Sequence, residues 1–213
     1  ELVGADAKEV ERGLKTESRI GQKAYLSPGG AFAGGTLARD IAFLNKIGSE
    51  KCLATSLLSS IKASNDEHKQ WVKRRLQRLF SDLSKAKVAI WGLTYKPGTD
   101  TLRRSMAIEL CLWLVALGAK VAVHDPAVKE MPLELKGKVE KWDDELQVLQ
   151  GACSLVVGTE WPQYREARVD EVVRIAPRLV VLDANRFLSN LAKDARITYI
   201  GVGSPEQNAE CNS

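Results

Sequence analysis

The spacing of apolar residues changes near residue 87, and this change limits the fold more than any other feature of the sequence. Before it, apolar residues recur at intervals close to 3.6, the period of an amphipathic helix. After it, short runs of Val, Ile and Leu alternate with helical stretches, which is typical of a parallel sheet covered on both faces. We therefore expect a helical segment at residues 1–86 and a doubly wound α/β domain at residues 87–213.

Three helices are expected in the first part. Asp6 and Glu9 form a capping-box pattern, which opens a short helix ending at Leu14. After a glycine-rich loop, a second helix begins near residue 37 and stops at Gly48. A third helix spans residues 52–83 without interruption, and its length favours packing against another domain or subunit.

The second part is expected to hold a series of strands separated by helices. The expected strands lie at residues 87–93, 121–124, 154–157, 179–182 and 197–200. Residues 104–117 are expected to form a helix that Gly118 ends, and residues 143–150 a further helix. The tail at residues 207–213 is expected to be frayed.

The composition argues against several classes of protein. The 213-residue chain is 45% hydrophobic, enough for a core, but no run reaches about 18 apolar residues, so we expect no membrane span. The four cysteines show no metal-binding spacing, and Cys111 and Cys153 lie in apolar runs. We expect a cytoplasmic protein without disulfides or metal ions. The chain starts without Met or signal peptide, which we interpret as a start partway through a longer protein.

One basic stretch raises nucleic-acid binding as an alternative. Residues 69–87 carry seven basic side chains and one acidic side chain, with Trp71 among them. However, the net charge is only +4, and the same stretch has an apolar helical face. We therefore favour a solvated or subunit-facing helix and expect no nucleic-acid partner.

The loop after the first expected strand is the first candidate binding site. Ligands of doubly wound sheets bind at the carboxyl ends of the strands. Residues 94–105 supply Lys96, Arg103, several hydroxyls and a helix N-terminus, which together suit a phosphate group. The loop is neither a GxGxxG turn nor a P-loop. A solvated loop with surface charges is the alternative.

The second candidate is the glycine-rich stretch at residues 32–40. Its glycines allow the backbone to approach a ligand closely, and Arg39 and Asp40 follow on the first turn of a helix. The alternative is that Thr36 caps this helix and that both charges face solvent.

Several loops, taken in chain order, resemble those of the UDP-glucose/GDP-mannose dehydrogenase family. Residues 87–105 are similar to its nucleotide-binding signature, an apolar strand followed by F-K-P-x-T-D-D-x-R-x-S. The other matching segments are Ser18-Arg19-Ile20-Gly21, Phe32 to Asp40, the stretch from Asn65, Val123-His124-Asp125-Pro126, Thr159-Glu160-Trp161 and Asp183-Ala184-Asn185-Arg186. The resemblance covers about residues 1–203.

The resemblance implies part of a three-part enzyme. The family has an N-terminal NAD-binding domain, a central helical region through which subunits dimerise, and a C-terminal nucleotide-binding domain of Rossmann-like fold. This chain then holds part of the central region and the whole C-terminal domain, with NAD bound mainly by a domain outside it. The implied function is UDP-sugar binding in an NAD-dependent nucleotide-sugar 6-dehydrogenase that forms a homodimer.

The resemblance also implies roles for individual residues. Lys96 and Arg103 match residues that bind the phosphates and sugar, and either Asn185 or Arg186 matches a substrate-contacting Arg. Arg39 replaces a Lys near the cofactor, and Asp40 matches a catalytic Asp. The remaining residues implied around the sugar nucleotide are Arg19, which would reach the partner subunit's substrate, and Tyr25, Leu26, Phe32 and Gly34.

The main departure from the family is Thr36, which stands where the family has its nucleophilic Cys. A thiol with a pKa near 8.5 is partly ionised at neutral pH, whereas a Thr hydroxyl is far less acidic. The usual covalent second oxidation should therefore fail or be very slow. Two interpretations stay open: a dehydrogenase with altered chemistry, or a non-catalytic nucleotide-sugar-binding or dimerisation module.

Overall fold

The computed structural model describes residues 1–205, and residues 87–200 contain the expected parallel sheet. Its strands are β1 (Lys87–Trp91), β2 (Lys120–His124), β3 (Glu140–Lys141), β4 (Ser154–Val157), β5 (Val180–Leu182) and β6 (Thr198–Ile200). All neighbours pair in parallel, in the order β3-β2-β1-β4-β5-β6. The chain winds outward from β1, returns to its other side at β4 and winds outward again. This order confirms the doubly wound, Rossmann-like α/β fold.

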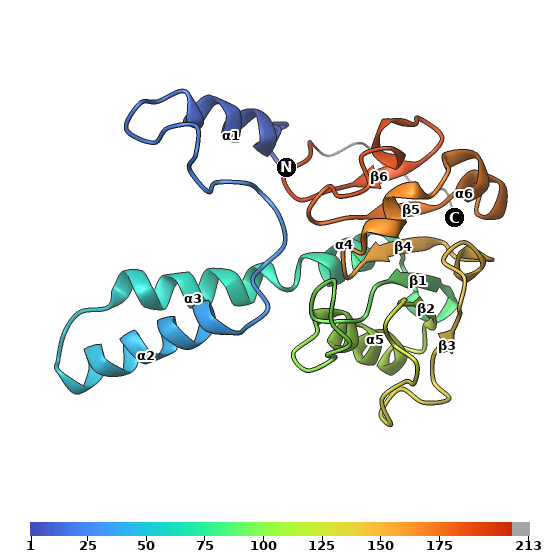
Figure 1. The fold of residues 1–213 in the computed structure, drawn as a ribbon, viewed down its shortest axis with the longest axis horizontal. Coiled ribbons are helices and arrows are strands. Elements are labelled where there is room, and N and C mark those ends of the chain that lie inside the picture. Colours follow the sequence, from blue (N-terminus) through green and yellow to red (C-terminus); the bar gives the residue numbers. More distant parts are fainter. Residues whose placement is uncertain (206–213) are drawn as a thin grey trace.

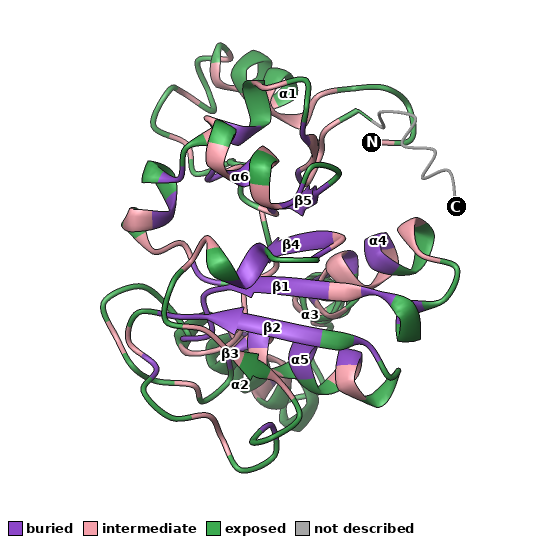
Figure 2. Ribbon diagram, turned by 90° about the vertical axis from the view of Figure 1, so that its right-hand side faces the viewer, coloured by how far each residue is buried: buried purple, intermediate pink, exposed green. Residues whose placement is uncertain are grey.

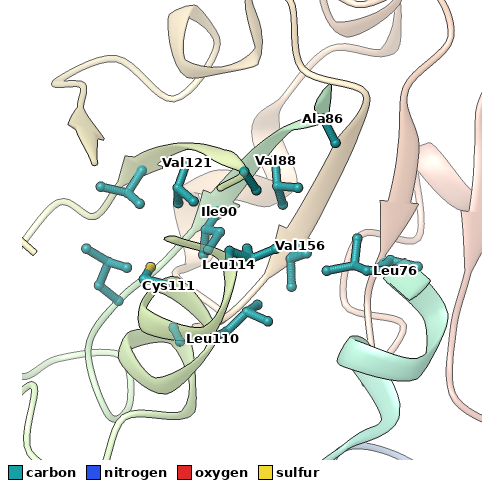
Figure 3. Packing of buried hydrophobic residues seen from close by; sticks show 14 of the residues in the cluster. Leu76, Ala86, Val88, Ile90, Leu110, Cys111, Leu114, Val121 and Val156 are labelled. Carbon is teal, nitrogen blue, oxygen red and sulfur yellow. The ribbon is translucent and has the colours of Figure 1, made fainter. Parts of the chain in front are cut away.

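Both faces of the sheet are buried because alternate residues of each strand point to opposite sides. On β1, Val88 and Ile90 join one apolar cluster, while Ala89 and Trp91 join the other. The first cluster is covered by α5 (Met106–Ala116) and α4 (Trp71–Leu79). The second is covered by α6 (Val169–Ile175) and the short helical turns Gln147–Leu149, Pro162–Glu166 and Leu191–Lys193. Figure 3 shows the packing on the first face, and Figure 2 shows the buried strands at the centre of the domain.

The helical segment consists of a short helix and a projecting arm. The helix α1 (Ala7–Lys15) is capped by Asp6, whose carboxylate accepts the Lys8 N–H at 2.7 Å. The arm is a hairpin of α2 (Thr36–Glu50) and α3 (Ser56–His68), which extends away from the sheet (Figure 1). Its exposed apolar side chains are Leu37, Phe43, Leu44, Leu53, Leu57 and Ile61.

The prediction of one uninterrupted helix at residues 52–83 is wrong. The hairpin turn occupies the first residues of this range, and a break at Lys69-Gln70 separates α3 from α4. At the break, the His68 Nε2 lies 2.7 Å from the Gly29 carbonyl oxygen. This contact ties the end of α3 to a distant loop, which the spacing of apolar residues does not reveal.

Three smaller expectations also differ from the structure. The helix α2 continues past Gly48 to Glu50, because Gly48 packs closely against Thr55 within the hairpin. The helix expected at residues 143–150 is wrong: the Asp144 carboxylate accepts two N–H groups at 2.8 Å, and only a short helical turn follows. The helix expected at residues 104–117 begins later, at Met106, and α6 and β3 were not predicted.

Residues 1–205, the part of the chain that the structure describes, can be compared with the expectations about membrane spans, metal sites and cysteines. No helix there combines the length and apolar character needed to cross a bilayer. Over the same residues, no three His, Cys, Asp or Glu side chains gather as metal ligands would. Cys111 and Cys153, which the apolar runs predict to be core residues, differ: Cys111 is fully buried, whereas Cys153 is partly exposed. Both are free thiols, as is the exposed Cys52. Cys211 and the tail expected to be frayed lie outside the described residues.

Candidate functional site

A cleft of about 400 Å³ opens at the carboxyl ends of β1, β4 and β5. Its walls come from four places: the loop after β1, the turn after β4, Asn185 after β5, and a segment leading into α2. Because β1 and β4 are neighbours at which the winding direction reverses, the cleft lies where doubly wound sheets bind their ligands. We call residues 29–34 the strap, because they cross from the helical segment over this edge of the sheet.

The buried carboxylate of Asp125 fixes the loop after β1. Its Oδ2 accepts the N–H groups of Leu93 and Thr94 at 2.6 and 2.9 Å and the Trp161 indole N–H at 3.1 Å. Its Oδ1 accepts the Ala127 N–H at 2.8 Å. One carboxylate thus joins the turns after β1, β2 and β4, so its role here is to shape the cleft floor.

Two glycines allow β1 and β4 to meet at the floor of the cleft. Gly92 has φ of +87° and packs against Thr159, so no room is left for a side chain. Gly158 packs in turn against the Gly92 carbonyl oxygen and Ala107. The Thr159 hydroxyl donates to the Thr94 carbonyl oxygen at 2.5 Å, which joins the two turns directly.

His124, the last residue of β2, and Tyr164 form a buried, uncharged pair. Burial lowers the pKa of His124 and raises the pKa of Tyr164. The Tyr164 hydroxyl donates to the His124 carbonyl oxygen at 3.1 Å and lies 3.0 Å from its Nδ1. His124, which directly precedes Asp125, is therefore held in place by the buried Tyr164 hydroxyl.

Four of the residues expected at the site line the cleft together: Phe32, Gly34, Lys96 and Asn185. Lys96 is exposed, so its ammonium group is free to meet an anion. The amide of Asn185 is engaged by the protein: it accepts the Gly30 N–H at 2.7 Å and donates to Glu160 at 2.5 Å.

Thr36, Arg39 and Asp40 lie on the exposed first turn of α2, beside the cleft lining rather than in it. The preceding Gly35 has φ of +75°, and a side chain there would begin 3.0 Å from the Tyr95 hydroxyl oxygen. Tyr95 lines the cleft, so the start of α2 faces its rim. Arg39 pairs with Asp40 at 3.3 Å, and no side chain caps this end of the helix.

The structure does not bring the remaining expected residues to the cleft. Arg103 is exposed on the same loop as Lys96 without lining the cleft. Arg19 pairs with Glu17 at 3.0 Å, and Tyr25 and Leu26 are exposed on the connection between α1 and the strap.

Arg186 also turns away from the cleft. Its Nη1 pairs with Asp6 at 2.9 Å and its Nη2 donates to the Val202 carbonyl oxygen at 3.2 Å. It therefore joins the start of α1 to the end of β6. Of the two alternatives after β5, only Asn185 lies in the cleft.

Some lining residues were not predicted as site residues. Thr94, Tyr95, Ser105, Met106, Gly158, Thr159 and Glu160 all line the cleft. Thr159 and Glu160 belong to one of the segments that resemble the dehydrogenase family, so this resemblance could have identified them as site residues.

The described residues do not form a cradle for NAD of the usual Rossmann kind. In that arrangement a tight glycine turn leads from the first strand to a helix whose N-terminus binds the pyrophosphate. Here residues 92–105 separate β1 from α5, and the Ser105 Oγ itself accepts the N–H groups of Ala107 and Ile108 at 3.2 and 3.3 Å. That helix end is already filled.

The fold and cleft define a class: a doubly wound nucleotide-binding domain carrying a helical arm. Residues 89–190 match the UDP-binding domain of the UDP-glucose/GDP-mannose dehydrogenase family, and residues 1–67 match its central domain. The chain belongs to the UDP-glucose/GDP-mannose dehydrogenase family.

Two relatives illustrate the extent of the match. A UDP-glucose 6-dehydrogenase of Pseudomonas aeruginosa is 29% identical over 213 residues, covering 96% of this chain and 47% of that protein. The UDP-glucose 6-dehydrogenase TuaD of Bacillus subtilis is 27% identical, covering 96% and 45%. The chain spans about half the length of these relatives.

Solved structures share the fold at low sequence identity. A UDP-glucose dehydrogenase of Pyrobaculum islandicum superposes with a TM-score of 0.77 at 24% identity, over 96% of this chain and 45% of that one. A UDP-D-ManNAc dehydrogenase of Pyrococcus horikoshii gives a TM-score of 0.77 at 20% identity, over 97% and 46%.

Proposed function

We propose that this chain is the nucleotide-sugar-binding part of an NAD-dependent nucleotide-sugar 6-dehydrogenase, and that its cleft takes the UDP portion of the ligand. The observation that carries the proposal is the cleft at the switch between β1 and β4, with Lys96 exposed at its wall. The match of residues 89–190 to a UDP-binding domain supports it.

The cleft offers separate surfaces for the two ends of a nucleotide diphosphate. The Lys96 ammonium pairs with the diphosphate, and Arg103 and Arg104, exposed on the same loop outside the cleft lining, add positive charge nearby. The half-buried Phe32 ring gives an apolar surface for the base or the sugar. The Glu160 carboxylate, which also lines the cleft, accepts a hydrogen bond from the Asn185 amide at 2.5 Å.

The Lys96→Ala substitution tests this proposal. We expect UDP affinity to fall by about 10- to 100-fold, because one charge-assisted contact contributes about 1.5–3 kcal/mol. Titration calorimetry of UDP into the unmodified and substituted chains measures the change. Lys129→Ala, which removes an exposed Lys from outside the cleft, is the matched control and should leave affinity unchanged. Equal affinity of all three chains would contradict the proposed role of Lys96.

The proposal places the NAD-binding cradle outside this chain, because the start of α5 is already capped and the relatives are about twice as long. This chain's own contribution at the reacting end would be Arg39 and Asp40, on the turn of α2 that faces the cleft rim.

The same proposal includes a homodimer formed through the α2–α3 arm. Leu57 is 76% exposed and Phe43 is 60% exposed, and they lie on the two helices of the arm. Exposed apolar side chains gathered on one projecting element mark an interaction surface. A second copy of the chain is the proposed partner.

A second candidate function, binding without complete oxidation, is favoured by Thr36. The Thr36 hydroxyl has no hydrogen-bond partner among residues 1–205, so no neighbouring base activates it. Under this alternative, the cleft binds a nucleotide sugar but the covalent oxidation does not follow.

The Thr36→Cys substitution tests whether the first turn of α2 would still stabilise a thiolate at position 36. If it does, only the nucleophile is missing from this part of the site. A thiol on the uncapped first turn of α2 is favoured as thiolate by the helix dipole, whereas Cys52 follows the last turn of the same helix. We expect the introduced thiol to react about 5-fold faster with iodoacetamide at neutral pH than Cys52 does. Peptide mapping by mass spectrometry measures both rates in one sample, and an equal or slower rate would favour the binding module.

A further inference from the structure

The strap, residues 29–34, borders the candidate cleft, a groove along α3, and a smaller cavity that Gly30 and Ala31 help to line. Ala31, Phe32 and Gly34 line the candidate cleft, while Gly30, Ala31 and Phe32 also line a groove of about 450 Å³ along α3. The position of the strap therefore sets the width of the cleft. The strap contains no helix or strand, so other parts of the molecule must fix its backbone.

The side chain of Asn65 holds the strap from the α3 side. Its Oδ1 accepts the Phe32 N–H at 2.9 Å, and its Nδ2 donates to the Phe32 carbonyl oxygen at 2.9 Å. The carboxamide thus pairs with both backbone groups of one residue, as a neighbouring strand would. Asn65 is 8% exposed, and it lines the groove along α3 rather than the cleft.

A second contact from α3 lies three residues further on. The His68 Nε2 is 2.7 Å from the Gly29 carbonyl oxygen. This contact occurs where α3 ends, at the break before α4. The interruption of the long helix is thus the place at which the strap is attached.

The opposite side of the strap is held by Asn185, after β5. The Gly30 N–H donates to its Oδ1 at 2.7 Å, and Glu160 accepts from its Nδ2 at 2.5 Å, which directs the amide oxygen toward the strap. A side chain at Gly29 would collide with this oxygen, so the glycine permits the close approach. Contacts from the helical segment and from the α/β domain thus meet on three residues of the strap, Gly29, Gly30 and Phe32.

We propose that Asn65 and Asn185 are positioning residues, which hold the strap so that its Phe32 edge forms one wall of the nucleotide cleft. The inference rests on the proposed function, because it takes the ligand of the cleft to be a nucleoside diphosphate. Asn65 lies outside the cleft lining, so its effect on binding runs through the strap.

The decisive variant is Asn65→Asp, which is nearly isosteric. It keeps the acceptor for the Phe32 N–H but places a carboxylate oxygen against the Phe32 carbonyl oxygen. We expect UDP affinity, measured by calorimetry on the full chain, to fall roughly 10-fold, because the partly buried Phe32 carbonyl loses its donor and the strap loses one of its anchors. Without ligand, amide hydrogen exchange in a peptide covering the strap should accelerate. Asn65→Leu should act in the same direction, which excludes the added charge as the cause.

The matched control is Asn45→Asp, which adds the same charge on the arm. The Asn45 Oδ1 accepts the Ser59 hydroxyl at 2.9 Å, and an Asp there keeps that acceptor. Neither affinity nor strap exchange should change. Circular dichroism of each variant checks that the chain is folded, and Asn185→Asp gives an independent route if the Asn65 variants do not fold. It places like charge against Glu160, and Glu160→Gln added to it should restore strap protection.

The outcomes separate this inference from the proposed function. If the unmodified chain does not bind UDP, the proposed function is overturned, and strap exchange still decides whether Asn65 holds the strap. If it binds UDP and the Asn65 variants bind equally well, the positioning role is overturned. A loss of affinity with unchanged strap exchange also overturns it, because the effect would not run through the strap.

Discussion

Replacing Asp125 by alanine is expected to lower the free energy of unfolding by about 3–5 kcal/mol. The buried carboxylate accepts three backbone N–H groups and the Trp161 indole N–H, and each loses its partner in the variant. A buried donor left without an acceptor costs about 1–3 kcal/mol, so the losses together exceed those of an ordinary substitution. Urea unfolding followed by circular dichroism measures the change.

The control for Asp125→Ala is Asp143→Ala. The Asp143 side chain is 94% exposed and pairs with Lys141 at the surface, so its loss should change stability by no more than about 0.5 kcal/mol. If both variants were equally stable, Asp125 would not be the residue that joins the turns around the cleft.

Replacing Gly92 by alanine is expected to have an effect of similar size, about 3–5 kcal/mol. Gly92 has φ of +87°, and an added methyl group would lie 2.5 Å from the Thr159 nitrogen and 2.6 Å from its carbonyl oxygen. Backbone atoms cannot swing aside as a flexible side chain would. The turns after β1 and β4 must therefore separate, which also distorts the cleft floor.

Gly98→Ala separates the two causes of this loss. Gly98 also has a positive φ, +77°, but nothing lies within 4 Å of an added methyl group. It should lose only about 1–2 kcal/mol from the backbone conformation. Thermal unfolding of the two variants side by side measures the difference, and equal losses would show that contact with Thr159 contributes nothing.

The sheet was predictable because its strands carry their own signal. Runs such as residues 121–123 within β2 are apolar, and both of their faces are buried, so each strand is recognisable alone. The strand β3 has two residues at the sheet edge, one exposed and one half-buried, so it leaves no such pattern. The break at Lys69-Gln70 was not predictable, because the spacing of apolar residues continues through it; the contact beside it, of His68 with Gly29, joins residues that are far apart in the chain.

The candidate site was predictable in part for a related reason. Lys96 and Phe32 were identified because their loops have a distinctive residue order, and both line the cleft. Arg186 lies one residue beyond Asn185, yet it pairs with Asp6, which is far away in sequence. The residue order of a loop indicates that the loop lies at the site, but tertiary contacts decide which of its side chains face the cleft.

The most direct test of the account is a crystal structure of this chain grown with UDP. We expect difference density for the diphosphate within reach of the Lys96 ammonium, in the cleft between the strap and the loop after β1. A larger cleft lies at the amino ends of β1, β4 and β5, where it is lined by Arg78, Lys85, Cys153 and Arg178. Density for UDP in that cleft, with none in the cleft beside the strap, would contradict the proposed binding site.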